Sequence, residues 1–256
     1  MPQVSIITPT YNCARFIAQT IESVQAQTFT DWEMIISDDC STDDTLKVIE
    51  PYLNSDARIK YICNDKNSGA AITRNNALRV AQGRWIAFLD SDDLWMPAKL
   101  EQQIAFMESN GYAFSYTDYV EIDESSKSLG RLIIGPNHIT KVGMYAYCWV
   151  GCLTVMYDAK IVGLLQIKDI KKNNDYAMWL KVIRLADCYR LPQALSMYRK
   201  REGSISNHNY MTLVKWHYKL FREADNRSII TSLVLTLLNV ACGLCKKMFF
   251  VKNGRI

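Results

Sequence analysis

Short apolar runs alternate with segments of helical periodicity in the first part of the chain. The runs at 4–10, 32–39, 58–64 and 85–90 are rich in β-branched residues, which is typical of buried strands. Helices are predicted between them, because apolar positions recur there every three or four residues. The predicted helices cover 17–27, a segment that begins after Thr42, Asp43 and Asp44, a segment over 70–82 that stops at Gly83, and a segment with Pro97 in its first turn.

Four strand–helix alternations indicate a parallel sheet, because parallel strands need helical crossovers and bury both faces. The predicted fold class is α/β: a doubly wound, mostly parallel central sheet with helices on both faces, plus a C-terminal helical tail. Beyond residue 112 the pattern is less regular. Strands are predicted for FSYTDYVEI, RLII and GCLTVMY (151–157), and a helix is predicted over 173–186, where positions 176, 179, 180 and 183 form one apolar stripe.

Positive charge is concentrated near the C-terminal end. The 256 residues include 30 Lys and Arg against 26 Asp and Glu, a net charge of +4. Lys246, Lys247, Lys252 and Arg255 lie within 246–256, which has no acid, so the preceding residues are neutral overall. A nucleic-acid-binding protein needs a basic surface across its fold, and therefore no nucleic-acid partner is expected.

Polar residues follow each predicted strand of the first part. The strand ends read TPTYN (8–12), Asp38-Asp39, Asn64-Asp65 and DSDD (90–93). In open parallel sheets, ligands bind outside the carboxyl ends of the strands. We therefore expect the functional site at this edge of the sheet, and three of the four strand ends bring acids to it.

Asp90, Asp92 and Asp93 come directly after the apolar run WIAFL. Their mutual repulsion would destabilise the loop unless a cation joins them. Mg²⁺ and Mn²⁺ prefer oxygen ligands, and they commonly combine one or two carboxylates with substrate phosphates. The loop therefore predicts a divalent metal, Mn²⁺ or Mg²⁺, between the protein and a diphosphate. The alternative for these acids is a solvated turn that caps the next helix.

A diphosphate needs basic partners in this chain, because the sequence has no glycine-rich phosphate loop. It has 11 Gly residues and no G-x-G-x-x-G motif, and the pair Gly130 and Gly135 is followed by Pro136 instead of the Lys of a Walker loop. Arginine and lysine side chains, together with a metal, would neutralise the phosphates instead. The candidates are Arg74, Arg199, Lys200 and Arg201.

Five motifs in this order resemble those of the family 2 glycosyltransferases. They are VSIITPTYN, IISDDCSTDDT, TRNNAL, AQGRWIAFLDSDD and NNDYAMWL, and the likeness covers about residues 2–205. The resemblance implies a GT-A fold for residues 1–205, with residues 206–256 as a C-terminal helical region. It also implies an inverting transfer of a sugar from a nucleotide-sugar donor, commonly a UDP-sugar, to an acceptor hydroxyl.

The resemblance implies a set of nucleotide-binding residues. Thr8, Pro9 and Tyr11 would line the base pocket, Asp39 would contact the base, and Asp90 would lie toward the ribose. The whole set comprises Thr8, Pro9, Tyr11, Asp39, Arg74, Asp90 and Ser91.

The same resemblance implies a metal site and a diphosphate site. Asp92 would bind the metal, with Asp93 as a second ligand. Arg199 and Arg201 would belong to a segment that closes over the diphosphate.

Asp175 is the residue that the resemblance makes the catalytic base. The family often has Glu-Asp where this chain has Asn174-Asp175, so the base is retained and the residue before it differs. Asp175 would remove the proton of the acceptor hydroxyl as that oxygen attacks the anomeric carbon, which inverts the anomeric centre. A helix dipole favours the ionised form of an acid in its first turn. The alternative is that Asp175 is only a first-turn helix acid.

Residues 228–245 carry no charge and predict a helix. Ser232, Thr236, Asn239 and Gly243 form a narrow polar stripe on it, and the rest is apolar. Three arrangements stay open: a helix at a membrane surface with anionic lipid, a helix packed against the domain or a second subunit, and a span across the bilayer. The stripe and the flanking basic residues favour the membrane surface.

The N-terminal residues show no basic and apolar signal for secretion. We therefore expect a cytoplasmic protein, peripheral on the inner face of the cytoplasmic membrane. By analogy with the family that the motifs resemble, and together with the tail, the acceptor would be a lipid-linked saccharide, as in the assembly of bacterial surface polysaccharides. A homo-oligomer is compatible with the tail. Two other functions stay open: a sugar-phosphate nucleotidyltransferase, and a non-catalytic nucleotide- or metal-binding assembly subunit.

Overall fold

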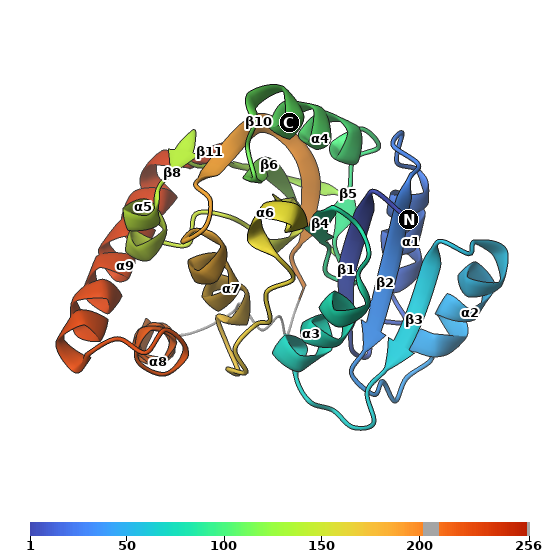
Figure 1. Ribbon diagram of the computed structural model, residues 1–256, viewed down its shortest axis with the longest axis horizontal. Coiled ribbons are helices and arrows are strands. Elements are labelled where there is room, and N and C mark those ends of the chain that lie inside the picture. The colour runs from blue at the N-terminus through green and yellow to red at the C-terminus, as the bar shows by residue number, and fades with distance from the viewer. Residues whose placement is uncertain (202–209, 255–256) are drawn as a thin grey trace.

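The computed structural model describes residues 1–201 and 210–254 (Figure 1). Its first part alternates strands and helices, as the apolar pattern predicts. The elements are β1 (Val4–Thr10), α1 (Ile17–Gln25), β2 (Trp32–Asp38), α2 (Thr45–Ser55), β3 (Ile59–Cys63), α3 (Ala70–Val80), β4 (Trp85–Phe88), β5 (Leu94–Trp95) and α4 (Lys99–Asn110).

The strands of this part form the parallel half of the sheet, in the order β3-β2-β1-β4. Val4 lies opposite Trp32 on one side of β1 and opposite Trp85 on the other. Almost every residue of β1 and β2 is buried, because helices cover both faces. The doubly wound arrangement predicted from the sequence is confirmed for this half.

The second part of the chain extends the sheet with strands of both directions. β9 pairs antiparallel with β4 and with β6, whereas β10 runs parallel to β6. The sheet as a whole is therefore mixed. The elements are β6 (Phe114–Ile122), β7 (Ser128–Ile133), β8 (His138–Ile139), α5 (Lys141–Ala146), the 3₁₀ turn η1 (Cys152–Thr154), β9 (Met156–Asp158), α6 (Ala159–Val162), α7 (Asn174–Val182), β10 (Cys188–Arg199), α8 (Tyr210–Lys219), the π-helical turn η2 (Leu220–Ala224), α9 (Ile229–Phe249) and β11 (Val251–Asn253).

Two apolar cores lie on opposite faces of the sheet. Val4 and Ile6 of β1 pack with α1, α2 and α4, whereas Ile7 packs on the other face with α3, α5 and α7. Trp179 of α7 meets Phe88 of β4 edge-on, with 5.1 Å between the ring centroids. This contact fixes α7 against the sheet and thereby sets where the first turn of α7 can lie.

Two predicted elements of the second part are wrong in extent. The run 151–157 is a strand only from Met156 onward, because Thr154 closes a turn through bonds from its N–H and hydroxyl to the Gly151 carbonyl at 3.0 and 2.7 Å. The helix predicted over 173–186 ends at Val182. Ile183 nevertheless stays buried in the turn that follows, which explains why the apolar stripe continues past the helix.

The C-terminal helix α9 turns its polar stripe toward the protein. Ser232, Thr236 and Asn239 are buried, and Asn239 Nδ2 donates to the Tyr145 carbonyl and to the Tyr176 hydroxyl, both at 3.1 Å. β11 then pairs with β7 at the edge of the sheet. The C-terminal region is thus packed against the rest, and the expected boundary at 205/206 lies outside the described residues.

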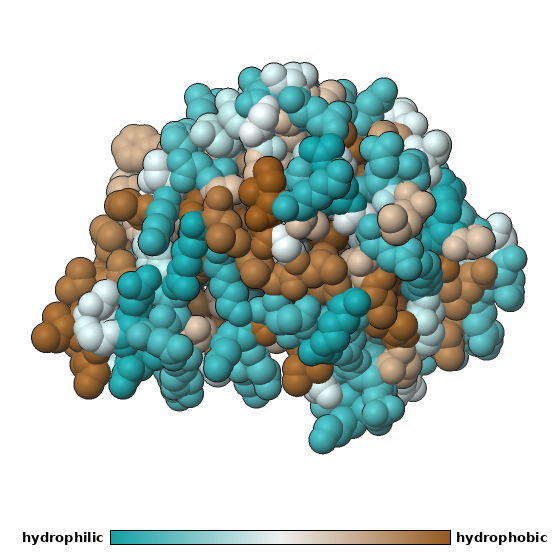
Figure 2. All heavy atoms as spheres, viewed as in Figure 1, coloured by the Kyte–Doolittle hydropathy of each residue, from teal (hydrophilic) through white to brown (hydrophobic). Residues whose placement is uncertain are grey.

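The outward side of α9 is apolar, and Figure 2 shows hydrophobic atoms over this helix at the left of the molecule. Its exposed side chains include Ile230, Leu233, Leu237, Met248 and Phe249. With 21 residues and a mean hydropathy of 1.8, α9 is also long and apolar enough to cross a bilayer, on length and composition alone.

Candidate active site

The ends of β1, β2 and β4 lie at one edge of the sheet, as the sequence predicts. The register places Thr10 opposite Asp38, and the Asp39 N–H donates to the Thr10 carbonyl at 2.9 Å. Farther along the edge, the Leu89 N–H donates to the Ile7 carbonyl at 3.1 Å. The polar residues that follow these three strands therefore surround one region.

Asp38 and Asp39 hold the loops of this edge. Asp38 accepts bonds from Ser41 and from the Tyr61 hydroxyl, the latter at 2.7 Å. Asp39 Oδ1 accepts from the Ser68 N–H at 2.7 Å, and its Oδ2 accepts from the Gly69 N–H at 2.8 Å. Asp39 thereby fixes the start of α3, and its role toward a base stays a prediction.

The end of β1 is only partly open to a ligand. Tyr11 is 48% exposed and presents its ring at the surface, and Pro9 is partly buried. Thr8 has no exposed surface, and its hydroxyl has no hydrogen-bond partner among residues 1–201 and 210–254. Thr8 therefore lies beneath the site, and the open part of this strand end is formed by Pro9 and Tyr11.

Arg74 connects residues 90–93, here called the aspartate loop, to the first turn of α7. Its Nη2 pairs with Asp90 Oδ1 at 2.5 Å, and its Nη1 donates to Asn174 Oδ1 at 2.7 Å. Burial lowers the pKa of Arg74, but the negative charges nearby, that of Asp90 first and that of Asp175 among the others, outweigh it, so that the net shift of the pKa is upward. Arg74 is thus a fixed cation between two acids, and Asn174 is its neutral partner.

The three acids of the loop lie in different environments. Asp92 is 17% exposed at its side chain and pairs with Arg201 Nε at 2.7 Å. Asp93 is fully buried and accepts from the Arg199 N–H at 2.8 Å. Burial and the neighbouring Asp92 and Asp90 charges raise the pKa of Asp93 well above its usual value. Asp93 consequently supports the loop from below.

Arg199 lies inside the protein, with 1% of its surface exposed. Its Nε donates to the Asp92 carbonyl at 2.7 Å, and its Nη2 donates to Gln19 Oε1 at 2.8 Å. Its Nη1 donates to Ser126 Oγ at 2.9 Å. These bonds join the aspartate loop, α1 and the 123–126 turn, so the geometry gives Arg199 a positioning role and leaves Arg201 as the accessible arginine.

The donor set suits a metal that shares its ligands with a substrate. Asp90 and Asp92 are the partly exposed carboxylates of the loop, at 31% and 17% of their side chains. Within the described ranges, no group of three or more His, Cys, Asp or Glu side chains could hold a metal by itself. Two carboxylates plus diphosphate oxygens are the ligands that Mg²⁺ and Mn²⁺ commonly use, so the residues present fit such an ion.

Asp175 lies in the first turn of α7, beside the Arg74–Asn174 bond. Burial raises the pKa of its carboxyl, Arg74 lowers it and Asp90 raises it, and the net shift is upward. A carboxylate with a raised pKa accepts a proton more readily, which suits a general base.

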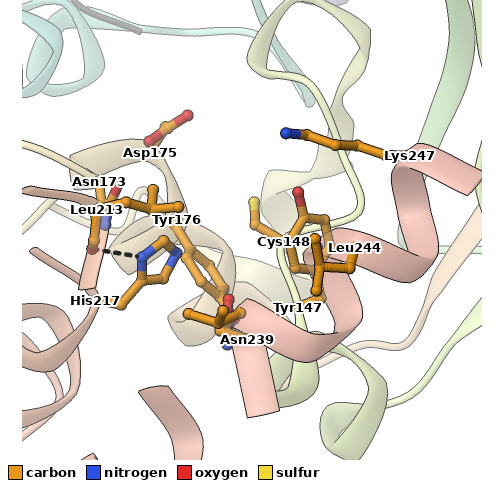
Figure 3. A pocket seen from close by; sticks show the side chains of 12 residues that line it. Tyr147, Cys148, Asn173, Asp175, Tyr176, Leu213, His217, Asn239, Leu244 and Lys247 are labelled. Atoms are coloured by element: carbon orange, nitrogen blue, oxygen red, sulfur yellow. Dashed lines mark hydrogen bonds between the residues drawn. The ribbon is translucent and has the colours of Figure 1, made fainter. Parts of the chain in front are cut away.

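Asp175 also faces a cavity of about 220 Å³ (Figure 3). The cavity lies between α7, α8, α9 and the segment after α5. Its lining comprises Tyr147, Cys148, Asn173, Asp175, Tyr176, Leu213, His217, Asn239, Val240, Gly243, Leu244 and Lys247. Apart from Asp175, the resemblance did not assign a role to any of these, because most come from helices far along the chain. The polar stripe that includes Asn239 in an otherwise apolar run was the available signal.

Comparison with known proteins decides the family. The model of glycosyl transferase family 2 matches residues 5–149, more than half of the chain. The chain belongs to glycosyl transferase family 2. It is 40% identical to TuaG of Bacillus subtilis, a protein named for a glycosyltransferase of teichuronic acid biosynthesis, over 88% of this chain and 89% of that protein.

A second relative matches over nearly the full length. The chain is 37% identical to WfgD of Escherichia coli over 98% of both chains. WfgD is named UDP-Glc:α-D-GlcNAc-diphosphoundecaprenol β-1,3-glucosyltransferase. The prediction of a glycosyltransferase is therefore confirmed.

Solved structures confirm the GT-A fold. TarS of S. aureus, in a crystal structure with UDP-GlcNAc, has a TM-score of 0.72 at 22% identity, over 93% of this chain and 72% of that one. The mannosyltransferase PcManGT of Pyrobaculum calidifontis, solved with GDP-Man and Mn²⁺, has a TM-score of 0.62 at 14% identity, over 95% and 75%. Glycosyltransferases of this fold thus include one solved with Mn²⁺ beside a nucleotide sugar.

Proposed function

We propose that this glycosyltransferase transfers a sugar from a UDP-sugar to a hydroxyl group of a saccharide linked through a diphosphate to a lipid, with inversion at the anomeric carbon. The observation that carries the proposal is the placement of Asp175. It faces a cavity on one side, and Arg74 and Asn174 tie it to Asp90 of the aspartate loop on the other.

The relatives support the donor and the acceptor. WfgD carries UDP-Glc and a diphosphoundecaprenol-linked GlcNAc in its name, and its match covers 98% of this chain. TuaG, by its name, belongs to the synthesis of a cell-surface polymer. We therefore assign this chain to the assembly of a surface polysaccharide.

The nucleotide would lie along the carboxyl edge of the parallel strands. Tyr11 offers an exposed ring on which a base can stack, and Pro9 lies next to it. Asp39 would contact the base while its carboxylate also holds the start of α3 through the Gly69 N–H. Asp90 and Ser91, at the end of β4, would meet the ribose.

A divalent metal, Mn²⁺ or Mg²⁺, would be held by Asp92, with Asp90 beside it. When bound, it would neutralise the charge that develops on the leaving diphosphate. Asp93 would act through the backbone of the loop, since it is buried against β10. Arg201 would exchange its bond with Asp92 for one with the diphosphate, because a guanidinium pairs with phosphate oxygens as readily as with a carboxylate.

In the reaction, the acceptor oxygen forms a bond to the anomeric carbon as the bond from that carbon to the diphosphate breaks. The proton of the acceptor hydroxyl goes to the Asp175 carboxylate, and the electron pair of the broken bond leaves with UDP. A single displacement on the face opposite the leaving group inverts the anomeric configuration. Arg74 bonds to Asp90 and to Asn174, the residue before the base. It would thereby keep the aspartate loop and the first turn of α7 at a fixed separation while Asp175 accepts the proton.

The protein would work at the cytoplasmic face of a membrane. The outward side of α9 is apolar, and Lys247 in its last turn and Lys252 of β11 are exposed. This is the composition of an interfacial helix, which anionic lipid attracts. Self-association through the same face of α9 would be the competing arrangement.

Asp175→Asn tests the assignment of the base. The variant should bind UDP and Mn²⁺ as the wild type does, because Asp175 lies in α7, outside the strand ends along which the nucleotide would lie. Transfer should fall by about 10²–10⁴-fold, the usual contribution of a general base. Transfer is measured with a radiolabelled UDP-sugar, and binding is measured by calorimetry.

Asp31→Asn is the matched control, since Asp31 is an exposed acid at the opposite end of β2. Near-normal turnover of Asp175→Asn would refute the assignment. Normal UDP-sugar binding without transfer by the wild-type protein would instead indicate a non-catalytic subunit.

A further inference from the structure

The cavity beside Asp175 is lined by residues of both α7 and α9. At one end lies the carboxylate of α7, and at the other lies Leu244, which lines the cavity and is 50% exposed on α9. We propose that this cavity is the acceptor site. It would receive the saccharide diphosphate of a lipid-linked acceptor, while the hydrocarbon chain of the lipid lies on the outward side of α9. This inference rests on the proposed function.

The walls of the cavity can recognise a sugar. Tyr147 and Tyr176 supply aromatic rings, and the Tyr176 ring meets the His217 ring edge-on at 6.3 Å between centroids. His217 Nδ1 donates to the Leu213 carbonyl at 2.9 Å, as the dashed line in Figure 3 shows. Since a carbonyl only accepts, Nδ1 carries the proton and Nε2 is left as an acceptor. Burial lowers the pKa of His217, so the ring is neutral at pH 7.

Asn239 adds a second acceptor to the lining. Its amide nitrogen is engaged by the Tyr145 carbonyl and the Tyr176 hydroxyl. The residue is 2% exposed, and across the described part of the chain Asn239 Oδ1 has no hydrogen-bond partner. Buried polar atoms are normally paired, so an unpaired acceptor in the wall of a cavity points to a ligand that donates a hydrogen bond. A sugar hydroxyl is such a donor.

Positive charge lies at the mouth of the cavity. In Figure 3 the Lys247 side chain extends from α9 over the same space that Asp175 faces from the other side. An ammonium group here would attract the diphosphate that joins sugar and lipid, because charge-assisted bonds to phosphate oxygens are stronger than neutral ones. Lys246, the preceding residue, instead points inward and donates to the Trp149 carbonyl at 3.2 Å.

The apolar side of α9 begins at the same mouth. Leu244 is shared between the cavity and the outer surface, and Met248 and Phe249 extend the exposed apolar surface beyond it. A chain attached to a diphosphate at Lys247 would therefore have apolar side chains to lie against. The arrangement places sugar, diphosphate and hydrocarbon chain in the order in which a lipid-linked acceptor carries them.

Comparing two acceptor compounds isolates the contribution that the diphosphate makes to acceptor binding. One is N-acetylglucosaminyl diphosphate esterified with a short alkyl chain, and the other is the same sugar as a simple alkyl glycoside. Lys247→Gln should raise the acceptor KM for the diphosphate ester by about tenfold or more, as expected for the loss of one charge-assisted bond. The KM for the alkyl glycoside and the KM for the UDP-sugar should not change.

Lys252→Gln is the matched control, because Lys252 carries the same charge on β11, away from the cavity lining. Leu244→Trp, which narrows the mouth, should raise the acceptor KM for both compounds. Leu185→Trp should leave both unchanged, because Leu185 is an exposed leucine in the turn after α7 and does not line the cavity. Thermal unfolding of each variant checks that it is folded.

The outcomes distinguish this inference from the function on which it rests. Unchanged acceptor KM values in folded Lys247→Gln and Leu244→Trp, with transfer intact, would overturn the acceptor site alone. An equal rise for both acceptors in Lys247→Gln would overturn the placement of the diphosphate. If the wild type neither binds UDP-sugars nor transfers a sugar, the proposed function itself fails.

Discussion

Replacement of Arg74 by Met tests the link between the aspartate loop and the base. In the wild type, Arg74 lowers the pKa of Asp175, while burial and the charge of Asp90 raise it. Arg74→Met removes the only one of these charges that lowers that pKa, so the pKa of Asp175 should rise. An opposite charge close to a carboxylate typically accounts for a shift of about one unit or more.

The sign of the kinetic effect follows from the role of Asp175 as a base. It must be ionised to accept a proton, so kcat/KM is lost as the pH falls through its pKa. With that pKa raised, the acid limb of the pH profile should move to higher pH by about one unit or more. The assay is kcat/KM for sugar transfer across pH, with the donor saturating.

Stability should fall as well. Arg74→Met removes the 2.5 Å ion pair with Asp90 and the 2.7 Å bond to Asn174. Asp90 is partly exposed, and water can replace part of what is lost, so the cost should be about 2–3 kcal/mol. For a chain of this size that corresponds to a drop in Tm of about 4–12 °C.

Arg79→Met is the matched control, since Arg79 lies on the same helix and is exposed. It should leave the acid limb in place. An acid limb in Arg74→Met that coincides with that of the wild type would refute the electrostatic role of Arg74, whatever happens to Tm.

Three further predictions concern the arginines, the metal and the apolar face. Arg199→Gln should lower the free energy of unfolding in urea by about 3–5 kcal/mol, because the buried bonds of Arg199 are lost. Arg201→Gln should raise the UDP-sugar KM with little change in stability. The reverse pattern would contradict the two assignments. Removal of divalent metal with EDTA should abolish transfer, and added Mn²⁺ should restore it. Asp92→Asn should need about tenfold more Mn²⁺ for the same rate. Transfer that does not depend on metal would exclude a role of the ion in the reaction. Leu237→Glu should weaken binding to vesicles that contain anionic lipid and leave Tm unchanged, because Leu237 is 71% exposed; unaltered co-sedimentation would argue against a membrane surface.

The first half of the fold could be predicted from the sequence because its strands are buried on both faces. A run such as VSIITPT has no charged residue and is rich in β-branched residues, which suits a strand buried on both faces, and the helix that follows has its own period. The run 151–157 is also apolar and uncharged, but its residues 152–154 form a 3₁₀ turn before the strand begins at Met156. The sequence alone does not reveal that the Leu153 carbonyl accepts from Trp95 Nε1 at 2.8 Å and from Ser196 Oγ at 3.2 Å.

The site could be predicted as far as strand order fixes it. Tyr11, Asp39 and Asp92 come to one edge because their strands are parallel neighbours or next neighbours in the sheet. Which arginine reaches the open surface could not be predicted. Arg199 is the last residue of β10 and Arg201 lies two positions beyond it, a spacing that in a continued strand would point both side chains the same way. The inward direction of the Arg199 side chain cannot be deduced from that spacing. That direction depends on Asp92, Gln19 and the 123–126 turn, which are far apart in the sequence.

The inward polar stripe of α9 keeps the leucines on its other side exposed in the purified protein. Bonds from Asn239 to Tyr145 and Tyr176 fix the rotation of the helix about its own axis. The helix therefore keeps its apolar side turned outward. In plain buffer, these apolar side chains can be buried only by association between protein molecules. The apparent molar mass should therefore rise with protein concentration and fall when a mild detergent is added.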